Sequence, residues 1–522
     1  MRSNPPVSLD AKRDPHSPAV SAPAAKSSRA PYIIALIVSL ACFAAVAIWL
    51  STHRMMWDDE FDAWHLIADP SWRHALASLN AGADGGPPLY YAIGRMIVAI
   101  TGLHPLALRL YSTLCFWLAA VVWTLILKRH FGGVIAIAAP AFAFLCNPEF
   151  IDQIAQVRFY GQLMFAFTMT VCVAMYIEET RPGARRSFVF SFIAGAFLVA
   201  SHPLGIVYSA GITFAQLFGK TSRTTRMPAI AGSVLSWATL LASLRGLRSG
   251  SATLTWLGKP TLAGLMHFYN NHPLLFARER YLSVAVNFAG LCLILYACLW
   301  FLRNRSKLSS GLWLLFCICA VLMVMPVGFF IASYLYKPMF LSRYMLPYTL
   351  GYATLAGAGV WIAARRFIVR SPAASATLIA LPLLAVAWVS VSEQALSPVA
   401  NLEPLLKLAQ STPVVFQYDT EILQAHFYTP SRAGHLFYLL VPTRPGQHGT
   451  LDAVAQQGYE PEIVYDRQFL QQHREFLYVD SPLQPLFFER DLRGNPHWTV
   501  EPAGTVDAAG ITLRVFRYTK ID

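Results

Sequence analysis

The residues best suited to chemistry are carboxylates that follow directly on an apolar run. Residues 32–50 carry no charge, and the chain then reads WDDEFD over residues 57–62, with a further carboxylate at Asp84. Carboxylates cannot enter hydrocarbon and are repelled by anionic headgroups, so such a cluster beside a membrane span indicates a function. A carboxylate in that position can take a proton from a hydroxyl or hold a cation.

These carboxylates cannot all act on the same point. On a helix Asp58, Asp59 and Glu60 face different directions, because consecutive side chains do not share a face. A helix cap followed by a solvated acidic turn is therefore an alternative interpretation. The aromatic residues Trp57, Phe61 and Trp64 are interleaved with the cluster. That pattern is typical of a membrane interface rather than of a solvated loop.

Two later polar segments could meet the carboxylates. Arg158 and Tyr160 lie in the stretch QVRFYG over residues 156–161, which opens an apolar run. An arginine held by aromatic neighbours can clamp a phosphate group, although an interfacial arginine that snorkels toward water is equally consistent. His202, in Ser-His-Pro at 201–203, and Tyr90, in PPLYY at 87–91, have the simpler alternatives of a turn histidine and an aromatic belt.

The composition identifies the elements that must position these residues. Of 522 residues, 55% are hydrophobic and 13% charged, about half the charged share of roughly 25% in soluble domains, and mean hydropathy is +0.45. The chain is thus predicted to be an all-α polytopic membrane protein. Its eleven predicted spans are 32–50, 106–127, 131–146, 161–177, 187–201, 203–219, 228–244, 284–302, 310–333, 344–364 and 374–392.

The basic residues predict the orientation. The formal net charge is +13, but Lys and Arg gather in short clusters between alternate apolar runs, as orientation signals do, and this excludes nucleic acid as a partner. We expect a cytoplasmic N-terminus and basic inner loops. Lys337 and Arg343 break the pattern on the outer side, where positive charge suits an anionic lipid headgroup. The eight cysteines lie in or beside apolar runs and predict no disulfide framework.

The chain divides into three predicted parts. Residues 1–30 are rich in Pro, Ser and Ala and are expected to form a disordered cytoplasmic tail. Residues 31–392 form the predicted transmembrane domain, whose outer loop 51–105 carries the carboxylates and interfacial helices. Residues 87–102 are predicted to form a helix that lies in the interface or is partly re-entrant. Residues 393–522 contain short strand-like runs and predict a small α/β domain on the outer face.

In this order the segments resemble the GT-C glycosyltransferases, specifically the superfamily of protein O-mannosyltransferases and aminoarabinose transferases. The resemblance covers about residues 50 to 350. It rests on Asp59-Glu60, DGGPPLYY at 84–91, Arg109, QVRFY at 156–160, SHP at 201–203 and RYMLP at 343–347.

The resemblance implies a GT-C membrane fold and a transferase of the bacterial inner membrane. Such an enzyme moves a sugar from a polyprenyl-phosphate donor to a lipid, glycan or protein acceptor on the outer face, with inversion by direct displacement. By analogy Asp59 would be the general base, and Glu60 would position the acceptor or the base. Arg158, with Lys337 or Arg343, would neutralise the leaving phosphate. The other predicted substrate-binding residues are Asp58, Asp84, Tyr90, Tyr160 and His202.

Some expectations stay open at this stage. No cofactor is required by this chemistry, although the additional Asp58 leaves a divalent cation site open. Many relatives have a histidine or lysine where this chain has Gly86, which moves the expected positive charge to Arg158 and the later basic pair. The alternatives are a transporter or flippase of lipid-linked sugar and a non-catalytic scaffold that binds polyprenyl lipid. Polar residues on one outer face, without an internal repeat, favour the enzyme.

Overall fold

The computed structural model describes most of the chain. The predicted tail at 1–30 lies outside the described residues except for Ala30. The described residues are 30–243, 258–271, 280–394, 403–416, 419–428, 436–440, 458–459, 463–480, 496–508 and 511–521.

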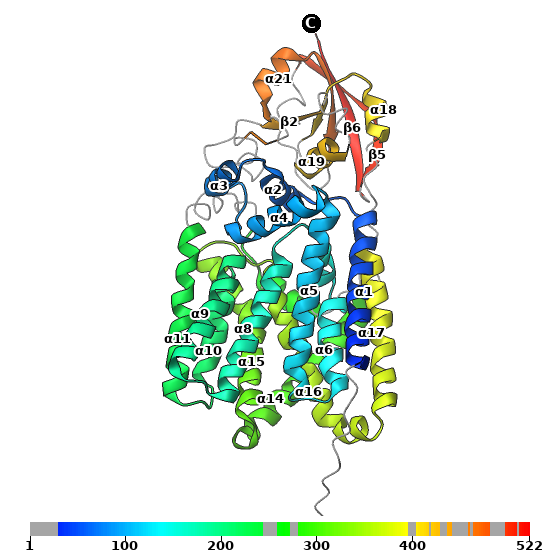
Figure 1. Cartoon of the computed structure of the whole chain (residues 1–522). Helices are drawn as coiled ribbons and strands as arrows, with labels where there is room; N and C mark the ends of the chain where they lie inside the picture. The colour runs from blue at the N-terminus through cyan, green and yellow to red at the C-terminus, as the bar shows by residue number, and fades with distance from the viewer. Residues whose placement is uncertain are drawn as a thin grey trace, which may run out of the picture.

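A bundle of long apolar helices makes up most of the molecule and carries the C-terminal sheet at one end (Figure 1). Within the described residues six helices are long and apolar enough to cross a membrane; a seventh candidate is the pair α6 (Gly133–Cys146) and α7 (Pro148–Ile154), bent by 73°. The multi-pass helical fold is confirmed, but the count of eleven spans is not. The six lie in α5 (Pro105–Lys128), α8 (Tyr160–Thr180), α9 (Ala184–Ser201), α14 (Arg280–Arg303), α15 (Ser310–Leu335) and α17 (Pro372–Gln394).

Two of the other helices fall short of a span for simple reasons. The helix α10 has only 13 residues, and α11 includes Arg223, Arg226 and Pro228, which lower its apolar character. The predicted span 228–244 is instead the end of α11 followed by a 3-10 helix, η1. These remaining elements of the bundle are α1 (Ala30–His53), α10 (Gly205–Leu217), α11 (Arg223–Ser236), η1 (Trp237–Ser243), α13 (Leu262–Asn271), η3 (Arg305–Lys307), η4 (Ser342–Met345) and α16 (Leu346–Arg370).

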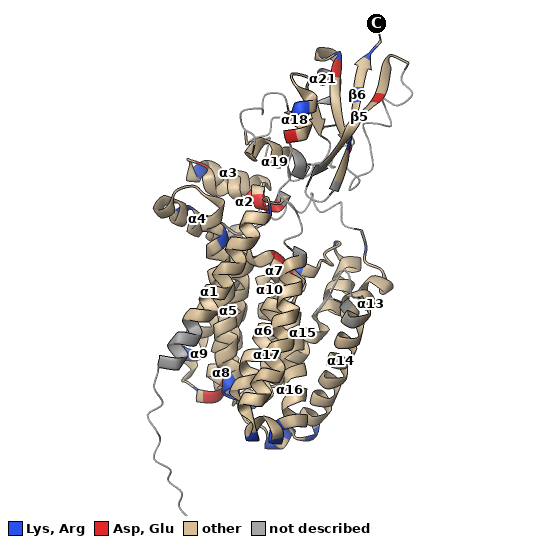
Figure 2. Cartoon of the chain, turned by 90° about the vertical axis from the view of Figure 1, so that its right-hand side faces the viewer, with Lys and Arg blue, Asp and Glu red and all other residues tan. Residues whose placement is uncertain are grey.

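The charged residues divide between the two ends of the bundle. Figure 2 shows Lys and Arg gathered at the end away from the C-terminal sheet, where α5 ends at Lys128 and α14 ends at Arg303. The carboxylates of α2 (Asp58–Ala68) lie at the opposite end. The molecule therefore has a basic end, as the sequence pattern predicts, and an opposite end where the carboxylates of α2 lie.

Three short helices form a layer between the bundle and the sheet (Figure 1). They are α2, α3 (Trp72–Ala81) and α4 (Pro88–Thr101), all within the predicted outer loop. Pro88 starts α4, where its fixed φ and missing N–H cost nothing. Gly82 ends α3 at a φ of 97°, a conformation that favours glycine. The helix predicted at 87–102 is thus present, and it lies over the end of the bundle.

The C-terminal part is a six-stranded mixed sheet in the order β3-β2-β1-β4-β6-β5. The strands β3, β2, β1 and β4 are parallel, whereas β6 pairs antiparallel with both β4 and β5. This confirms the predicted α/β character, with a strand order that the sequence does not reveal. The elements are α18 (Glu403–Ala409), β1 (Val414–Phe416), α19 (Asp419–Tyr428), β2 (Leu436–Leu440), β3 (Ile463–Tyr465), α21 (Asp466–Gln472), β4 (Glu475–Asp480), β5 (Trp498–Ala508) and β6 (Ile511–Lys520).

The two faces of this sheet have separate apolar cores. Along β4, Phe476 and Tyr478 pack on one face with Phe469 of α21, whereas Leu477 and Val479 belong to the core that continues into the rest of the molecule. This alternation follows from the two-residue period of a strand. The second face joins the sheet to the layer that contains α2.

Candidate active site

The helix α2 presents its two central carboxylates to different partners. Successive helical side chains are about 100° apart, so Asp59 and Glu60 cannot face the same point. Asp59 lies 2.5 Å from Nη1 of Arg343, measured from its Oδ2 atom, and its side chain is 21% exposed. Glu60 is buried and turned toward α5. Asp59 is therefore the carboxylate that remains accessible to a substrate.

The charge of Asp59 is set by two arginines. Burial alone would raise the pKa of its carboxyl, but the guanidinium groups of Arg343 and Arg158 outweigh burial and hold that pKa below its usual value. Asp59 is thus an ionised carboxylate at neutral pH. An ionised carboxylate is the form that can accept a proton.

Arg158 is a deeply enclosed cation of the site. Its Nη1 donates to Asp84 Oδ2 at 2.8 Å and to the carbonyl oxygen of Asp59 at 2.6 Å, and its guanidinium carbon lies 4.5 Å from the centre of the Phe159 ring. Only 6% of Arg158 is exposed. The contact with Asp59 fixes the backbone of α2 relative to the segment that precedes α8.

The same two arginines keep unused donors. Among the described residues, Nε of Arg158 and Nε of Arg343 are buried without a hydrogen-bond partner. A buried donor without a partner costs roughly 1–3 kcal/mol, so such atoms mark a place where a ligand can bind. Two guanidinium groups with donors to spare suit a phosphate, which accepts several hydrogen bonds at once.

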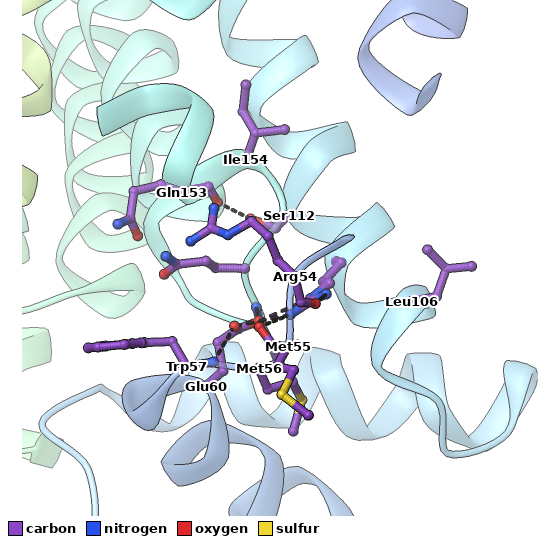
Figure 3. Close-up of polar contacts among 12 residues, drawn as sticks. Arg54, Met55, Met56, Trp57, Glu60, Leu106, Ser112, Gln153 and Ile154 are labelled. Carbon is purple, nitrogen blue, oxygen red and sulfur yellow. Dashed lines mark hydrogen bonds and ion pairs between the residues drawn. The ribbon is translucent and has the colours of Figure 1, made fainter. Parts of the chain in front are cut away.

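Glu60 belongs to the framework rather than to the accessible site. Its Oε1 accepts from Arg109 Nε at 3.1 Å and from the Val157 backbone N–H at 2.8 Å. Its Oε2 accepts from Arg109 Nη2 at 3.1 Å and from the Trp57 backbone N–H at 2.8 Å. Figure 3 shows Glu60 directed into this network beside Trp57. With four donors on a side chain only 2% exposed, Glu60 can fix the position of Asp59 through α2.

Arg109 extends this network to the segment before α2. Its Nη1 donates to the Arg54 carbonyl oxygen at 3.3 Å and its Nη2 to that of Met55 at 3.2 Å. Arg109 was part of the sequence resemblance but had no role assigned. The structure gives it one, because a single buried guanidinium joins α5 to both sides of the entry into α2.

The helix α8 must approach α5 closely to bring Arg158 into place. A Cβ atom added at Gly161 would lie 2.4 Å from the carbonyl oxygen of Ser112 in α5. Only glycine leaves room for this contact. Gly86 has a similar place in the outer layer, since a Cβ there would lie 2.4 Å from the Tyr91 hydroxyl oxygen. Tyr91 therefore fills the space that a longer side chain at position 86 would need.

His202 and its aromatic neighbours flank Arg158. The His202 ring lies 4.3 Å from that of Phe159 and 5.9 Å from that of Tyr160. Burial and the charges of Arg158 and Arg343 lower the pKa of His202 well below its usual value, so its ring is neutral at pH 7. Its Nδ1 accepts from the Leu204 backbone N–H at 3.1 Å, which leaves the ring proton on Nε2 as a donor.

The remaining predicted residues differ in how closely they join the site. Tyr90 is buried behind Phe159, with ring centres 6.0 Å apart, so it supports Arg158 indirectly. Asp58 is the first residue of α2. Lys337 is half-buried between α15 and η4, ahead of Arg343. Substrate binding by these three residues stays a prediction.

Two carboxylates near the site had no role assigned from the sequence. Glu149 Oε2 accepts a hydrogen bond from the Ser342 hydroxyl, next to Arg343. Asp152 forms an ion pair with Arg54, with 2.5 Å between Oδ1 and Nη2. The polar segment that starts at Asn147 was the available signal. Its partners could not be identified, because they lie far away in the sequence.

The divalent cation that Asp58 leaves open stays a prediction, since the side chain of Asp58 lies outside the described structure. The described part of the chain contains no group of three His, Cys, Asp or Glu side chains placed to hold an ion. Asp59 and Asp84 each already face an arginine. We therefore derive no step through a divalent cation.

Comparison with known proteins identifies the fold. No protein-family model matches the sequence, and no curated protein matches it. Among solved structures, ArnT from Cupriavidus metallidurans bound to undecaprenyl phosphate aligns over 94% of this chain and 98% of its own, with a TM-score of 0.55 and 13% identity. The archaeal oligosaccharyltransferase AglB from Archaeoglobus fulgidus, in complex with an inhibitory peptide and a dolichol-phosphate, aligns over 87% and 70%, with a TM-score of 0.51 and 11% identity.

Both neighbours are glycosyltransferases of the GT-C fold. This chain has the GT-C fold as well, from the bundle through the outer layer to the C-terminal sheet. The apo state of ArnT from Cupriavidus metallidurans also aligns over 94% of this chain and 98% of its own, with a TM-score of 0.56 and 15% identity. At these identities the likeness concerns the fold, and the activity must be argued from the site.

Proposed function

We propose that this protein is a membrane glycosyltransferase that takes its sugar from a polyprenyl-phosphate donor. The observation that carries the proposal is the placement of Asp59 between Arg158 and Arg343, each with an Nε that has no partner in the described structure. This cluster lies at the end of an apolar bundle opposite its basic end. Fold neighbours that bind undecaprenyl phosphate or dolichol-phosphate support the same class of ligand.

The proposed reaction is a single displacement at the sugar C1. The acceptor hydroxyl gives its proton to Asp59 while its oxygen forms the new bond to C1. The bond between C1 and the phosphate oxygen breaks, and the electron pair leaves with the polyprenyl phosphate. Arg158 and Arg343 stabilise the negative charge that grows on that phosphate. Attack opposite the leaving group inverts the configuration at C1.

Donor binding would also activate the base. Arg343 contacts Asp59 at 2.5 Å, and a phosphate between the two arginines would compete for that guanidinium. As Arg343 turns to the phosphate, Asp59 loses part of the positive charge that lowers its pKa. The carboxylate then becomes more basic only when the donor is present. Because the donor binds before Asp59 becomes more basic, unproductive proton transfer in the empty enzyme is limited.

The proposed placement in the cell follows the charges. With the basic end in the cytoplasm, the site, the outer layer and the C-terminal sheet lie on the outer face of a bacterial inner membrane. The apolar bundle lets the polyprenyl chain stay in the bilayer while its phosphate reaches the arginines. The acceptor is a lipid, a glycan or a protein.

A transfer assay tests the proposal. Purified protein in nanodiscs receives a panel of polyprenyl-phosphate sugars and an envelope extract as acceptor, and release of polyprenyl phosphate is measured. We expect release with one donor class, and its loss in Arg158→Gln. Binding of the lipid without release from any donor would favour the scaffold. Movement of an intact lipid-linked sugar between leaflets would favour the flippase.

A further inference from the structure

The helix that carries Asp59 is held from the side of the C-terminal sheet as well as from the bundle. Two residues before α2, the Met56 backbone N–H donates to the Tyr428 hydroxyl oxygen at 3.1 Å. Gln424 Nε2 donates to the Met56 carbonyl oxygen at 3.0 Å. Tyr428 and Gln424 both belong to α19. One residue thus has both backbone groups bound by side chains of the C-terminal part.

The middle of α2 has an aromatic contact with the same helix. The Phe427 ring meets Phe61 edge-on at 5.7 Å between ring centres and meets Trp64 edge-on at 5.3 Å. Phe61 and Trp64 share a face because they are three residues apart. Such aromatic pairs contribute about 0.5–1.5 kcal/mol each beyond the area they bury.

The far end of α2 has a third contact. The Tyr459 hydroxyl donates to Asp69 Oδ2 at 2.5 Å, and the Tyr459 ring stacks on His65 at 5.5 Å. Asp69 is the residue that closes α2. Contacts from the C-terminal part therefore lie before, along and after the helix.

These contacts are on the opposite side from the chemistry. Asp59 and Phe61 are two residues apart, which is about 200° around the helix axis. While Phe61 is fixed against Phe427, Asp59 must face the bundle, where Arg343 and Arg158 lie. The C-terminal side chains do not touch the predicted site of reaction, so they act through the position of α2.

We propose that Gln424, Phe427, Tyr428 and Tyr459 are positioning residues that clamp α2 and set the location of Asp59 for proton transfer. This inference rests on the proposed function. Misplacement of a catalytic group by about 1 Å can lower a rate 100-fold, so a loose α2 would lower kcat. The donor phosphate would still bind, since Arg158 keeps its contacts with Asp84 and Phe159, which lie outside α2.

Two variants test the clamp independently. Gln424→Met with Tyr428→Phe removes the hydrogen bonds to Met56, and Phe427→Leu removes the aromatic contact. We expect both to lower kcat about 10- to 100-fold with an unchanged Kd for polyprenyl phosphate. Amide hydrogen exchange over residues 56–68 should become faster in both. Phe427→Tyr keeps the aromatic ring, so its kcat should match that of the wild type.

The matched controls lie on the other face of the sheet. Phe469→Leu and Tyr518→Phe make the same changes in the separate core beside α21 and should leave kcat and the exchange of 56–68 unchanged. Normal kcat in both clamp variants would overturn the proposal, as would faster exchange without any loss of kcat. If wild-type protein transferred no sugar, the proposed function would fail. Exchange over 56–68 would still decide whether the clamp exists.

Discussion

At the scale of residues, the site is an arrangement of opposite charges with donors left over. Asp59 faces Arg343, and Asp84 faces Arg158, yet each arginine keeps a buried Nε without a partner in the described structure. Buried ion pairs contribute little net stability, because desolvation offsets most of the attraction. Their presence here is better explained by a ligand that carries negative charge.

The pH dependence of the reaction tests the link between Arg343 and Asp59. As a base Asp59 must be ionised, and its lowered pKa places the loss of activity below the usual aspartate value of about 3.9. Arg343→Gln removes a positive charge that stabilises the carboxylate, so the pKa of Asp59 rises. In Arg343→Gln we expect the acid limb of the kcat/KM profile to move to higher pH. This shift is separate from any decrease in the maximal rate.

The control for this profile is Arg517→Gln, which removes a guanidinium of the C-terminal sheet that pairs with Glu475. Its acid limb should match that of the wild type. An unchanged limb in Arg343→Gln would show that Arg343 does not set the charge of Asp59.

The sequence pointed to the charges around Asp59 better than to the ion pair that joins Glu60 and Arg109. Asp59, Arg158 and Arg343 come from three segments far apart in the chain, and the structure brings them together. Each was visible as a charge at the edge of an apolar run. The pairing of Glu60 with Arg109 could not be predicted, because neither segment contains a signal for a partner 49 residues away.

At the scale of elements, buried contacts fix α2 against its neighbours. Glu60 and Arg109 join α2 to α5 and to the segment before α8. Pro88 and Gly82 set the ends of neighbouring helices, as local sequence predicts. The strand runs at 414–416 and 476–479 were also predictable. Their order was not, since long connections bring β4 beside β1 and β6 beside β4.

Glu60→Gln is expected to destabilise the fold. It leaves the Arg109 guanidinium buried without its full counter-charge, which typically costs about 3–5 kcal/mol. We expect a lower Tm in nanodiscs. The double variant Glu60→Gln with Arg109→Met should recover part of the lost Tm, because no buried charge is then left without its partner. A normal Tm with lost transfer would instead make Glu60 a catalytic residue.

Gly161→Ala tests the approach of α8 to α5. The new methyl group would meet the Ser112 carbonyl oxygen at 2.4 Å, so the helices must separate, at a cost of about 1–3 kcal/mol. We expect weaker binding of polyprenyl phosphate, because Arg158 moves with the start of α8. Gly133→Ala adds the same methyl group at the start of α6 with nothing within 4 Å. It should bind normally; equal loss in both variants would contradict the account.

At the scale of the whole molecule, three layers follow one another: the helical bundle, the layer of α2, α3 and α4, and the C-terminal sheet. Clusters of Lys and Arg lie at one end of the bundle, and the site, with its own arginines, lies at the other end beside α2, α3 and α4. The C-terminal sheet lies over this layer and contacts α2 through α19. The count of eleven spans is not confirmed within the described residues, where helices such as α10, with 13 residues, are too short to qualify by length.

The orientation of the molecule can be measured with reporters at the C-terminus. Because the C-terminal sheet is expected outside, alkaline phosphatase fused to the C-terminus should be active. A fluorescent protein fused at the same position should not fluoresce. The reverse pattern would place Asp59 in the cytoplasm. It would require a donor presented on the inner leaflet.

The most direct test of the central claim is Asp59→Asn, measured for both transfer and lipid binding. Asparagine cannot accept the proton, so transfer should fall about 10²- to 10⁴-fold. Binding of polyprenyl phosphate should stay equal or become tighter, because Arg343 loses its competing carboxylate. Full transfer by Asp59→Asn, or loss of lipid binding together with transfer, would contradict the assignment of Asp59 as the base between two phosphate-binding arginines.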